Sequence, residues 1–279
     1  MILKNLKSHT IYFKFIVCLG LLIASDPLLS QQQKDSGKSA VINHKVLLVP
    51  FKTTMFMNEI GKAVNAKTHL SYNKITEAFR YRLDLALSNT FKENYSTQSI
   101  LQLSKPADTT LAYIYNSVEY NYDLLPTDSS GESHAEFDPK LEKKHFIQNG
   151  QLQVPLDYSA RFMNTHIHNP QLLPYLNKKY GTDIIVFINE LDIKNVSNDT
   201  TVDLTQSNFR RQVIVQYSVL NMQKHYLAKG ILITYFPYTE NEPKVIGEKY
   251  FTTIARSMMQ ELAKGLKKAQ AAKPKAAIK

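Results

Sequence analysis

The stretch Lys45–Phe51, KVLLVPF, sets the fold class of this chain. Its consecutive apolar residues, closed by Pro50, are typical of a strand that is buried on both faces of an α/β sheet. After a loop, the apolar residues of Asn73–Asn94 recur at helical spacing on one stripe. The polar side chains of Arg80 and Asp84 fall off that stripe. These patterns predict a central strand followed by a long amphipathic helix.

The first thirty residues (1–30) predict an export signal. Basic residues precede the apolar segment Phe15–Ala24, FIVCLGLLIA, which has the length of a signal-peptide core and is short for a membrane span. We expect cleavage near Gln31, with an uncleaved signal anchor as the alternative. Residues 31–44 then read as a flexible linker.

The one cysteine of the chain, Cys18, lies inside the export signal. The residues that follow it are apolar, unlike the small polar stretch after a lipoprotein cysteine, so lipidation is not expected. The exported chain would therefore carry no cysteine. This excludes a thiol nucleophile, a zinc–thiolate site and an iron–sulfur cluster.

The net charge of +10 is unevenly distributed. Lysines of the signal and of the last sixteen residues account for most of it, and residues 31–263 carry little net charge. We therefore expect no nucleic-acid partner. Residues 267–279 predict a disordered basic tail. That tail offers a contact to an anionic membrane surface, with a merely solubilising role as the alternative.

The remaining apolar patterns predict a mixed sheet flanked by amphipathic helices. Strands are expected at 96–103 and 183–194, helices at 109–125, 170–180 and 252–266, and an antiparallel hairpin at 211–220 and 226–236. Gly181 predicts a glycine cap at the end of the second of these helices. Residues 104–170 read as an insertion, with weak strand-like alternation over 146–163. Residues 45–266 are thus expected to form a single α/β (α+β) domain with a C-terminal β-hairpin and helix.

Four segments carry a resemblance to a known family: VLLVPF, ITEAFRYRLDLAL, YGTDIIVFINEL and the hairpin VIVQYSVLNMQKHYLAKGILI. Their order resembles the periplasmic α/β domain shared by the curli secretion channel CsgG, the amino-terminal domain of TolB and the penicillin-binding-protein activator LpoB. The similarity covers Lys45–Leu101 and Pro170–Leu266. The hairpin turn here is NMQK, where the family has an Asp…Gly pair. The resemblance implies a Gram-negative periplasmic protein that acts by contact and assembly, and it carries over no catalytic residue.

One pattern resembles a metal site. His166 and His168 stand at i and i+2, where two side chains point the same way from a strand and can share a metal ion. A further ligand would have to come from His134, Glu136 or His145. Exposed loop histidines are the favoured alternative, and we assign no metal ligand.

A second pattern resembles an acid–base pair. Glu190 and Asp192 end the apolar strand DIIVFINELDI, and two carboxylates at such a place can act together in an α/β enzyme. No positioned nucleophile, Gly-rich phosphate loop or G-x-S-x-G elbow accompanies them. A solvated strand end is therefore favoured, and no catalytic residue and no cofactor-binding residue is assigned.

The leading hypothesis is a non-enzymatic periplasmic protein that binds a secretion or cell-envelope protein partner, with residues 104–170 and the hairpin turn supplying contacts. The first alternative is a homo-oligomeric outer-membrane secretion pore or its accessory ring, as the resemblance to CsgG implies. The second alternative is a hydrolase that uses Glu190, Asp192 or the His166/His168 pair. Loss of function in a folded Glu190 or His166 variant would favour the hydrolase.

Overall fold

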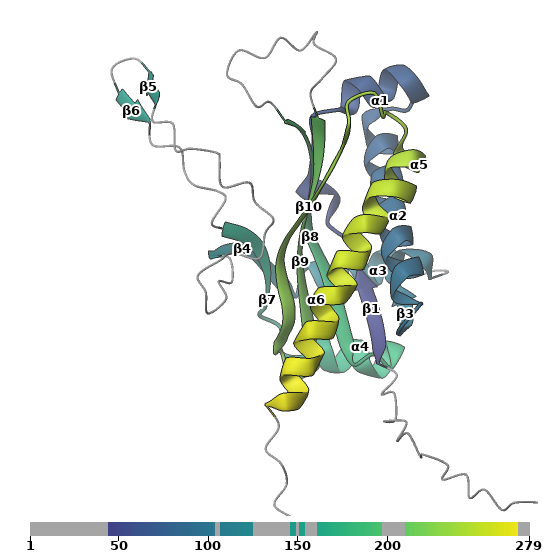
Figure 1. Cartoon of the computed structure of the whole chain (residues 1–279). Coiled ribbons are helices and arrows are strands. Elements are labelled where there is room, and N and C mark those ends of the chain that lie inside the picture. Colours follow the sequence, from purple (N-terminus) through teal and green to yellow (C-terminus); the bar gives the residue numbers. More distant parts are fainter. Residues whose placement is uncertain are drawn as a thin grey trace, which may run out of the picture. The chain divides into compact units, whose positions relative to one another are not determined.

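The computed structural model describes residues 44–103, 107–124, 146–148, 151–153, 161–196 and 210–272. Its centre is a six-stranded sheet with the order β10-β9-β8-β1-β3, in which β2 also pairs with β8 (Figure 1). The strands are β1 (Lys45–Val49), β2 (Phe56–Asn58), β3 (Ser96–Ser99), β8 (Ile184–Val196), β9 (Arg210–Asn221) and β10 (Tyr226–Pro237). β1 runs parallel to β3 and β8, whereas β8, β9 and β10 are antiparallel. The predicted mixed sheet and hairpin are confirmed.

The two apolar runs of the sequence form neighbouring strands at the centre of this sheet. Val46 of β1 pairs with Ile184 of β8, and both are buried. Asp183 joins the two strands where they begin, because its carboxylate accepts a hydrogen bond from the Lys45 backbone at 2.7 Å and lies 2.8 Å from His44 Nδ1. Burial of both faces explains why these strands show continuous apolar runs and no alternation.

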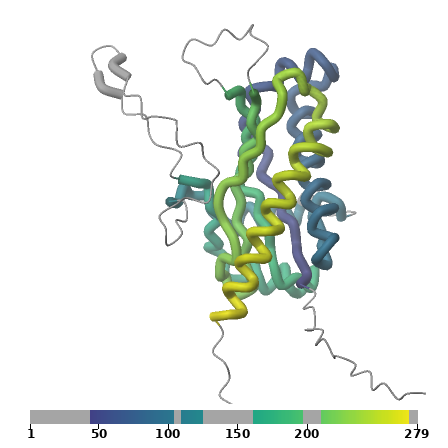
Figure 2. The backbone as a smooth tube through the Cα atoms, in the orientation of Figure 1, coloured from purple at the N-terminus to yellow at the C-terminus, as the bar shows by residue number. Residues whose placement is uncertain are grey.

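One face of the sheet is covered by helices from both ends of the chain. These helices are α1 (Gly61–Thr68), α2 (Tyr72–Phe91), α5 (Pro243–Ile246) and α6 (Thr252–Ala271), with a π-helical turn, η4 (Gly247–Phe251), joining the last two. Figure 2 shows α2 and α6 side by side on this face. Phe79 of α2 and Met258 of α6 are fully buried in the core that they share with β1, β8 and β9. The stripe predicted for the first long helix therefore faces this core.

The last helix is longer at both ends than the sequence predicts. The helix was expected to begin at 252, yet the helical segment begins at Pro243, and a proline is well tolerated there because the first residues of a helix need no N–H donor. The expected tail begins at 267, yet α6 continues to Ala271. Alanine-rich sequence favours this extension, and lysines at a helix C-terminus stabilise the helix dipole.

Two shorter helices cover part of the opposite face. They are α3 (Ala107–Tyr115) and α4 (Leu172–Tyr180). Leu111 and Leu176 from these helices pack with Leu47 and Phe187 of the sheet in a second apolar cluster. α4 ends at Gly181, whose φ of 64° lies in the left-handed region, as a glycine cap requires.

The helix predicted over 109–125 is wrong in its second half. α3 ends at Tyr115, and after a turn the chain forms strand β4 (Val118–Leu124), which pairs antiparallel with β7 (Arg161–Ile167). The sequence VEYNYDL alternates and is rich in residues that favour strands, so pairing with β7 outweighs the helical spacing. We call the β4–β7 pair the ribbon.

Smaller differences concern the connections. The strand expected over 96–103 is β3 followed by a 3-10 turn, η2 (Ile100–Gln102), because the Ser99 hydroxyl accepts a hydrogen bond from the Leu101 backbone and turns the chain. The loop after β1 contains a further 3-10 turn, η1 (Thr53–Met55), and β2, whose Phe56 is buried in the core. Short strands β5 (Phe146–Gln148) and β6 (Gln151–Gln153) pair with each other. Among the described helices, none combines the length and apolar character needed to cross a membrane.

Candidate functional site

A buried polar layer lies between the ribbon and the sheet. It holds β7 against β8 and β9 on the face opposite α2 and α6. We define it as Asn164 and Thr165 of β7, Asn189 and Glu190 of β8, and Gln216 and Ser218 of β9. All six side chains are buried.

Hydrogen bonds connect the members of this layer directly. Asn189 donates from Nδ2 to the Met163 carbonyl at 2.7 Å and to Ser218 Oγ at 2.8 Å, and its Oδ1 accepts from the Thr165 hydroxyl. Ser218 in turn donates to Asn164 Oδ1 at 2.6 Å. Buried polar groups with complete partners fix one arrangement of the strands that carry them. The layer thus fastens the ribbon to the sheet.

A β-bulge in β8 determines which side chains of this strand belong to the polar layer. The pairing between β8 and β9 shifts register between Ile188 and Glu190. Ile188 and Leu191 consequently both face the helix-covered core, and Glu190 faces the ribbon. Bulges re-aim side chains in this way because they add one residue to one strand. Without this one, Glu190 would point into the apolar core.

Glu190 is buried, which corrects the prediction of a solvated strand end. Its side chain is 8 % exposed, and its Oε2 accepts a hydrogen bond from Gln216 and lies 3.4 Å from the Tyr122 hydroxyl. Burial raises the pKa of Glu190 to about 7, and the neighbouring Asp192 carboxylate adds to the increase. Burial disfavours the charged form of a carboxyl group.

Asp192 is also buried, at 3 % exposure. Burial raises its pKa, although the ion pair with Lys194, in which Nζ lies 2.9 Å from Oδ2, opposes that effect. Its other carboxylate oxygen, Oδ1, has no partner among the described residues. Of the two carboxyl groups, Glu190, with its pKa of about 7, is the one that would suit a general base. The hydroxyl beside Glu190 is that of Tyr122, at 3.4 Å, and the Ser218 hydroxyl donates to Asn164 instead.

Only one of the two histidines of the predicted metal pattern lies on a strand. His166 lies on β7, and its Nε2 is 3.2 Å from Asp123 Oδ1 on β4, whereas His168 follows the end of the strand. Burial alone would raise the pKa of Asp123, but the Asn164 hydrogen bond, His166 and Lys229 together lower it. The other proposed ligands, His134, Glu136 and His145, lie outside the described residues. Within the described residues, no three potential ligands gather around a common point.

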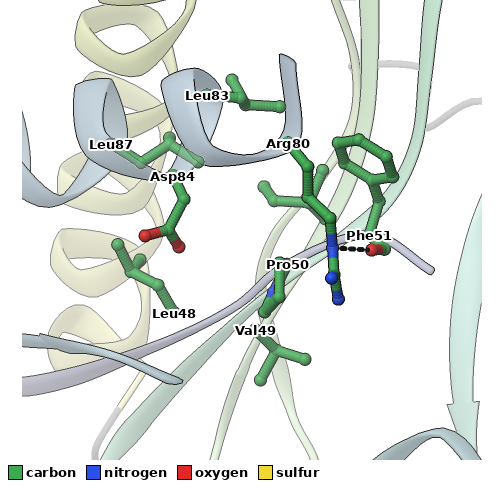
Figure 3. A pocket seen from close by; sticks show the side chains of 9 residues that line it. Leu48, Val49, Pro50, Phe51, Arg80, Leu83, Asp84 and Leu87 are labelled. Carbon is green, nitrogen blue, oxygen red and sulfur yellow. Dashed lines mark hydrogen bonds between the residues drawn. The ribbon is translucent and has the colours of Figure 1, made fainter. Parts of the chain in front are cut away.

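A second polar site lies at the carboxyl end of β1. Here the chain leaves β1 through α2 toward β3 on one side, while β8 lies on the other, which is the kind of switch point where open α/β sheets bind ligands. Figure 3 shows Arg80 and Asp84 of α2 above Pro50 and Phe51. The side chains fill the crevice and leave no room for a bound molecule.

Both charged side chains of this crevice form hydrogen bonds to neighbouring residues of the chain. Arg80 donates to the Phe51 carbonyl at 3.0 Å and to the Tyr115 hydroxyl at 3.0 Å, and Tyr115 donates to the Pro50 carbonyl at 2.8 Å. Asp84, 3 % exposed, accepts from the Ser99 hydroxyl at 2.6 Å, and burial raises its pKa. The sequence placed Asp84 off the apolar stripe and missed its burial.

Sequence reasoning also missed five of the six members of the polar layer. A signal for it exists in β9, where Gln212, Gln216 and Ser218 alternate with valine and tyrosine. That alternation indicates one apolar face and one polar face in a strand of the sheet interior. The partners on β7 carry no such signal, because Asn164 and Thr165 lie in a segment read as an insertion.

No family model and no curated protein matches the chain. A solved structure of a hypothetical protein from Chlamydia trachomatis is similar with a TM-score of 0.34 at 9% identity, covering 79% of this chain and 98% of that chain. A lipoprotein from Neisseria meningitidis is similar with a TM-score of 0.29 at 11% identity, again covering 79% and 98%. Both TM-scores are low, and the fold and function here rest on the chain's own residues.

Proposed function

We propose that this protein is a non-enzymatic periplasmic component of a bacterial cell envelope, which binds a secretion or envelope protein through a domain like those of CsgG, TolB and LpoB. The observation that carries the proposal is that the hydrogen bonds of the polar layer hold the ribbon against the sheet. Glu190, a carboxyl group that the hydrolase alternative uses, lies 3.4 Å from the Tyr122 hydroxyl of the ribbon, and Ser218 of the sheet donates to Asn164 of β7. Function then resides in surface contacts.

The end of the ribbon supplies an exposed contact surface. Leu124 of β4 is 69% exposed, and Tyr122, two residues before it, is also exposed. Tyrosine is enriched at protein interfaces because it joins apolar area to a polar tip. Both residues belong to the segment 104–170 that we expect to supply contacts.

Site-specific photo-crosslinking in intact cells of the source organism tests this proposal. A crosslinker at Leu124 should give one discrete protein adduct, whereas one at Tyr81, exposed on α2, should not. Glu190→Gln and His166→Ala should retain the adduct. Identical adducts from both positions, or none from Leu124, would overturn the assignment of this surface.

The pore alternative and the hydrolase alternative have their own readouts. A ring-sized assembly that needs detergent, measured by light scattering, would favour the secretion pore or its accessory ring. A folded Glu190→Gln or His166→Ala variant that loses the protein's cellular function while keeping the adduct would favour the hydrolase.

A further inference from the structure

Strand β10 ends the sheet with an open edge. In the order β10-β9-β8-β1-β3 it pairs with β9 on one side, and no described strand pairs with its other side. None of the backbone hydrogen bonds made by described loops and turns reaches Ala228–Phe236. Unpaired N–H and C=O groups along an edge strand are a template for another strand.

The ends of this edge are protected, and its middle is not. A register shift between Tyr226 and Ala228, the charge of Lys229 and the ring of Pro237 are devices that block strand addition. Between them runs ILITYF, residues 231–236, with no charge and no proline. Six-residue apolar segments of this kind have a strong tendency to pair. On the face away from the helices, Tyr235 is 41% exposed and Ile231 and Ile233 are partly exposed.

We propose that β10 pairs with β10 of a second copy of this chain, antiparallel about a two-fold axis at Ile233, so that the two sheets become continuous. A two-fold axis makes identical strands antiparallel and uses the same surface twice. This inference goes beyond the proposed function, because it concerns a different edge from the ribbon surface.

The side chains match in this register. Ile233 lies beside its own copy, Ile231 beside Tyr235 of the second copy, and Gly230 beside Phe236 of the second copy. Lys229 lies beside Pro237 of the second copy, so no like charges oppose each other, a juxtaposition that would be destabilising.

The register sets the length of the joint. In this register β10 overlaps its copy over nine residues, 229–237, which at about 3.3 Å each extend roughly 30 Å. Standard interfaces bury roughly 800 Å² per partner, so a joint of this length should give a dimer whose fraction depends on concentration. A foreign strand would meet the same edge, but only a second copy brings the matching register.

Light scattering of the purified protein tests the pairing. We expect a dimer whose fraction rises with concentration, and a monomer for Ile233→Lys, because a lysine at the centre of the joint would face its own copy. Ile214→Lys is the matched control: Ile214 pairs with Ile233 on the same face, but it lies in the interior strand β9. Ile214→Lys should remain dimeric. Circular dichroism and urea unfolding check that each variant folds.

A disulfide test covers the case in which Ile233→Lys unfolds. In a Cys18→Ser background, Ile233→Cys should form a disulfide-linked dimer on mild oxidation, because directly opposed residues of antiparallel strands have Cα atoms about 4.5 to 5.5 Å apart. Ile214→Cys should not. A monomer at all concentrations, a dimer lost only in Ile214→Lys, or a detergent-dependent ring would each overturn the pairing. A monomer would leave the crosslinking test of the proposed function unaffected.

Discussion

The carbonyl oxygen of Leu227 in β10 fills the space beside Gly265 in α6: a Cβ atom at position 265 would lie 1.8 Å from it. Helix and strand therefore lie too close together for a side chain at position 265. Leu227 lies at the register shift of β10, so the bulge directs this carbonyl toward the helix. The glycine in the middle of α6 is a packing requirement, although glycine weakens a helix.

Gly265→Ala should destabilise the protein. Intrinsic propensity alone would favour alanine inside a helix by about 1 kcal/mol. The clash with backbone reverses the sign, because overpacking typically costs about 1–3 kcal/mol and α6 would have to move away from β10. Urea unfolding should show a net loss of about 2 kcal/mol. Gln260→Ala, at an exposed position of the same helix, should be close to neutral. Equal stability of Gly265→Ala and the parent would contradict the close approach.

Glu190→Gln should change how stability depends on pH. The pKa of Glu190 is raised from 4.5 to about 7 by folding, so between these two values the unfolded chain releases a proton that the folded chain keeps. The free energy of unfolding therefore falls as pH rises through this window, by an amount on the order of 3 kcal/mol for this group. The variant, which cannot ionise, should match the parent near pH 4.5 and exceed it at pH 8.

Urea unfolding of both proteins at several pH values measures this difference. Asp84 and Asp192 have raised pKa values of the same sign, but both proteins retain them, so the difference between the two curves reports on Glu190. Parallel curves would mean that Glu190 is not held in a buried site.

Asn189→Leu should loosen the ribbon from the sheet. The substitution removes the donor to Met163 and Ser218 and the acceptor for Thr165, leaving buried polar groups unpaired at about 1–3 kcal/mol each. We expect a loss of about 3 kcal/mol and faster hydrogen exchange in β7. Asn121→Leu, at an exposed position of β4, should leave both quantities nearly unchanged. Unchanged exchange in the Asn189 variant would argue against the fastening role.

The sequence predicts what depends on local periodicity. Val46–Val49 and the start of β8 are apolar on both faces, and the stripe of α2 repeats at helical spacing, so these elements could be placed. The burial of Asp84 could not be predicted, because it depends on Ser99, fifteen residues away on another element. The turn at Asn116 could not be predicted either, because β4 forms only when it pairs with β7.

The candidate site depends almost entirely on such tertiary information. Glu190 was recognised as a polar residue in an apolar strand, but its place in the polar layer follows from a bulge that reverses the facing of the residues after Ile188. The sequence INEL carries no glycine or other mark of that bulge. Asn164 and Thr165 gain their roles only because the ribbon lies on this face of the sheet.

Lys224→Gly should stabilise the hairpin between β9 and β10. Lys224 has a φ of 63°, in the left-handed region, and its N–H donates to the Asn221 carbonyl at 3.1 Å. That conformation costs a residue with a side chain roughly 1–2 kcal/mol, whereas glycine adopts it freely at some entropic cost in the unfolded chain. We expect a net gain of about 0.5–1 kcal/mol. Gln223→Gly, at a neighbouring position without a positive φ, should lower stability instead. Equal effects of the two glycines in urea unfolding would contradict a strained turn at Lys224.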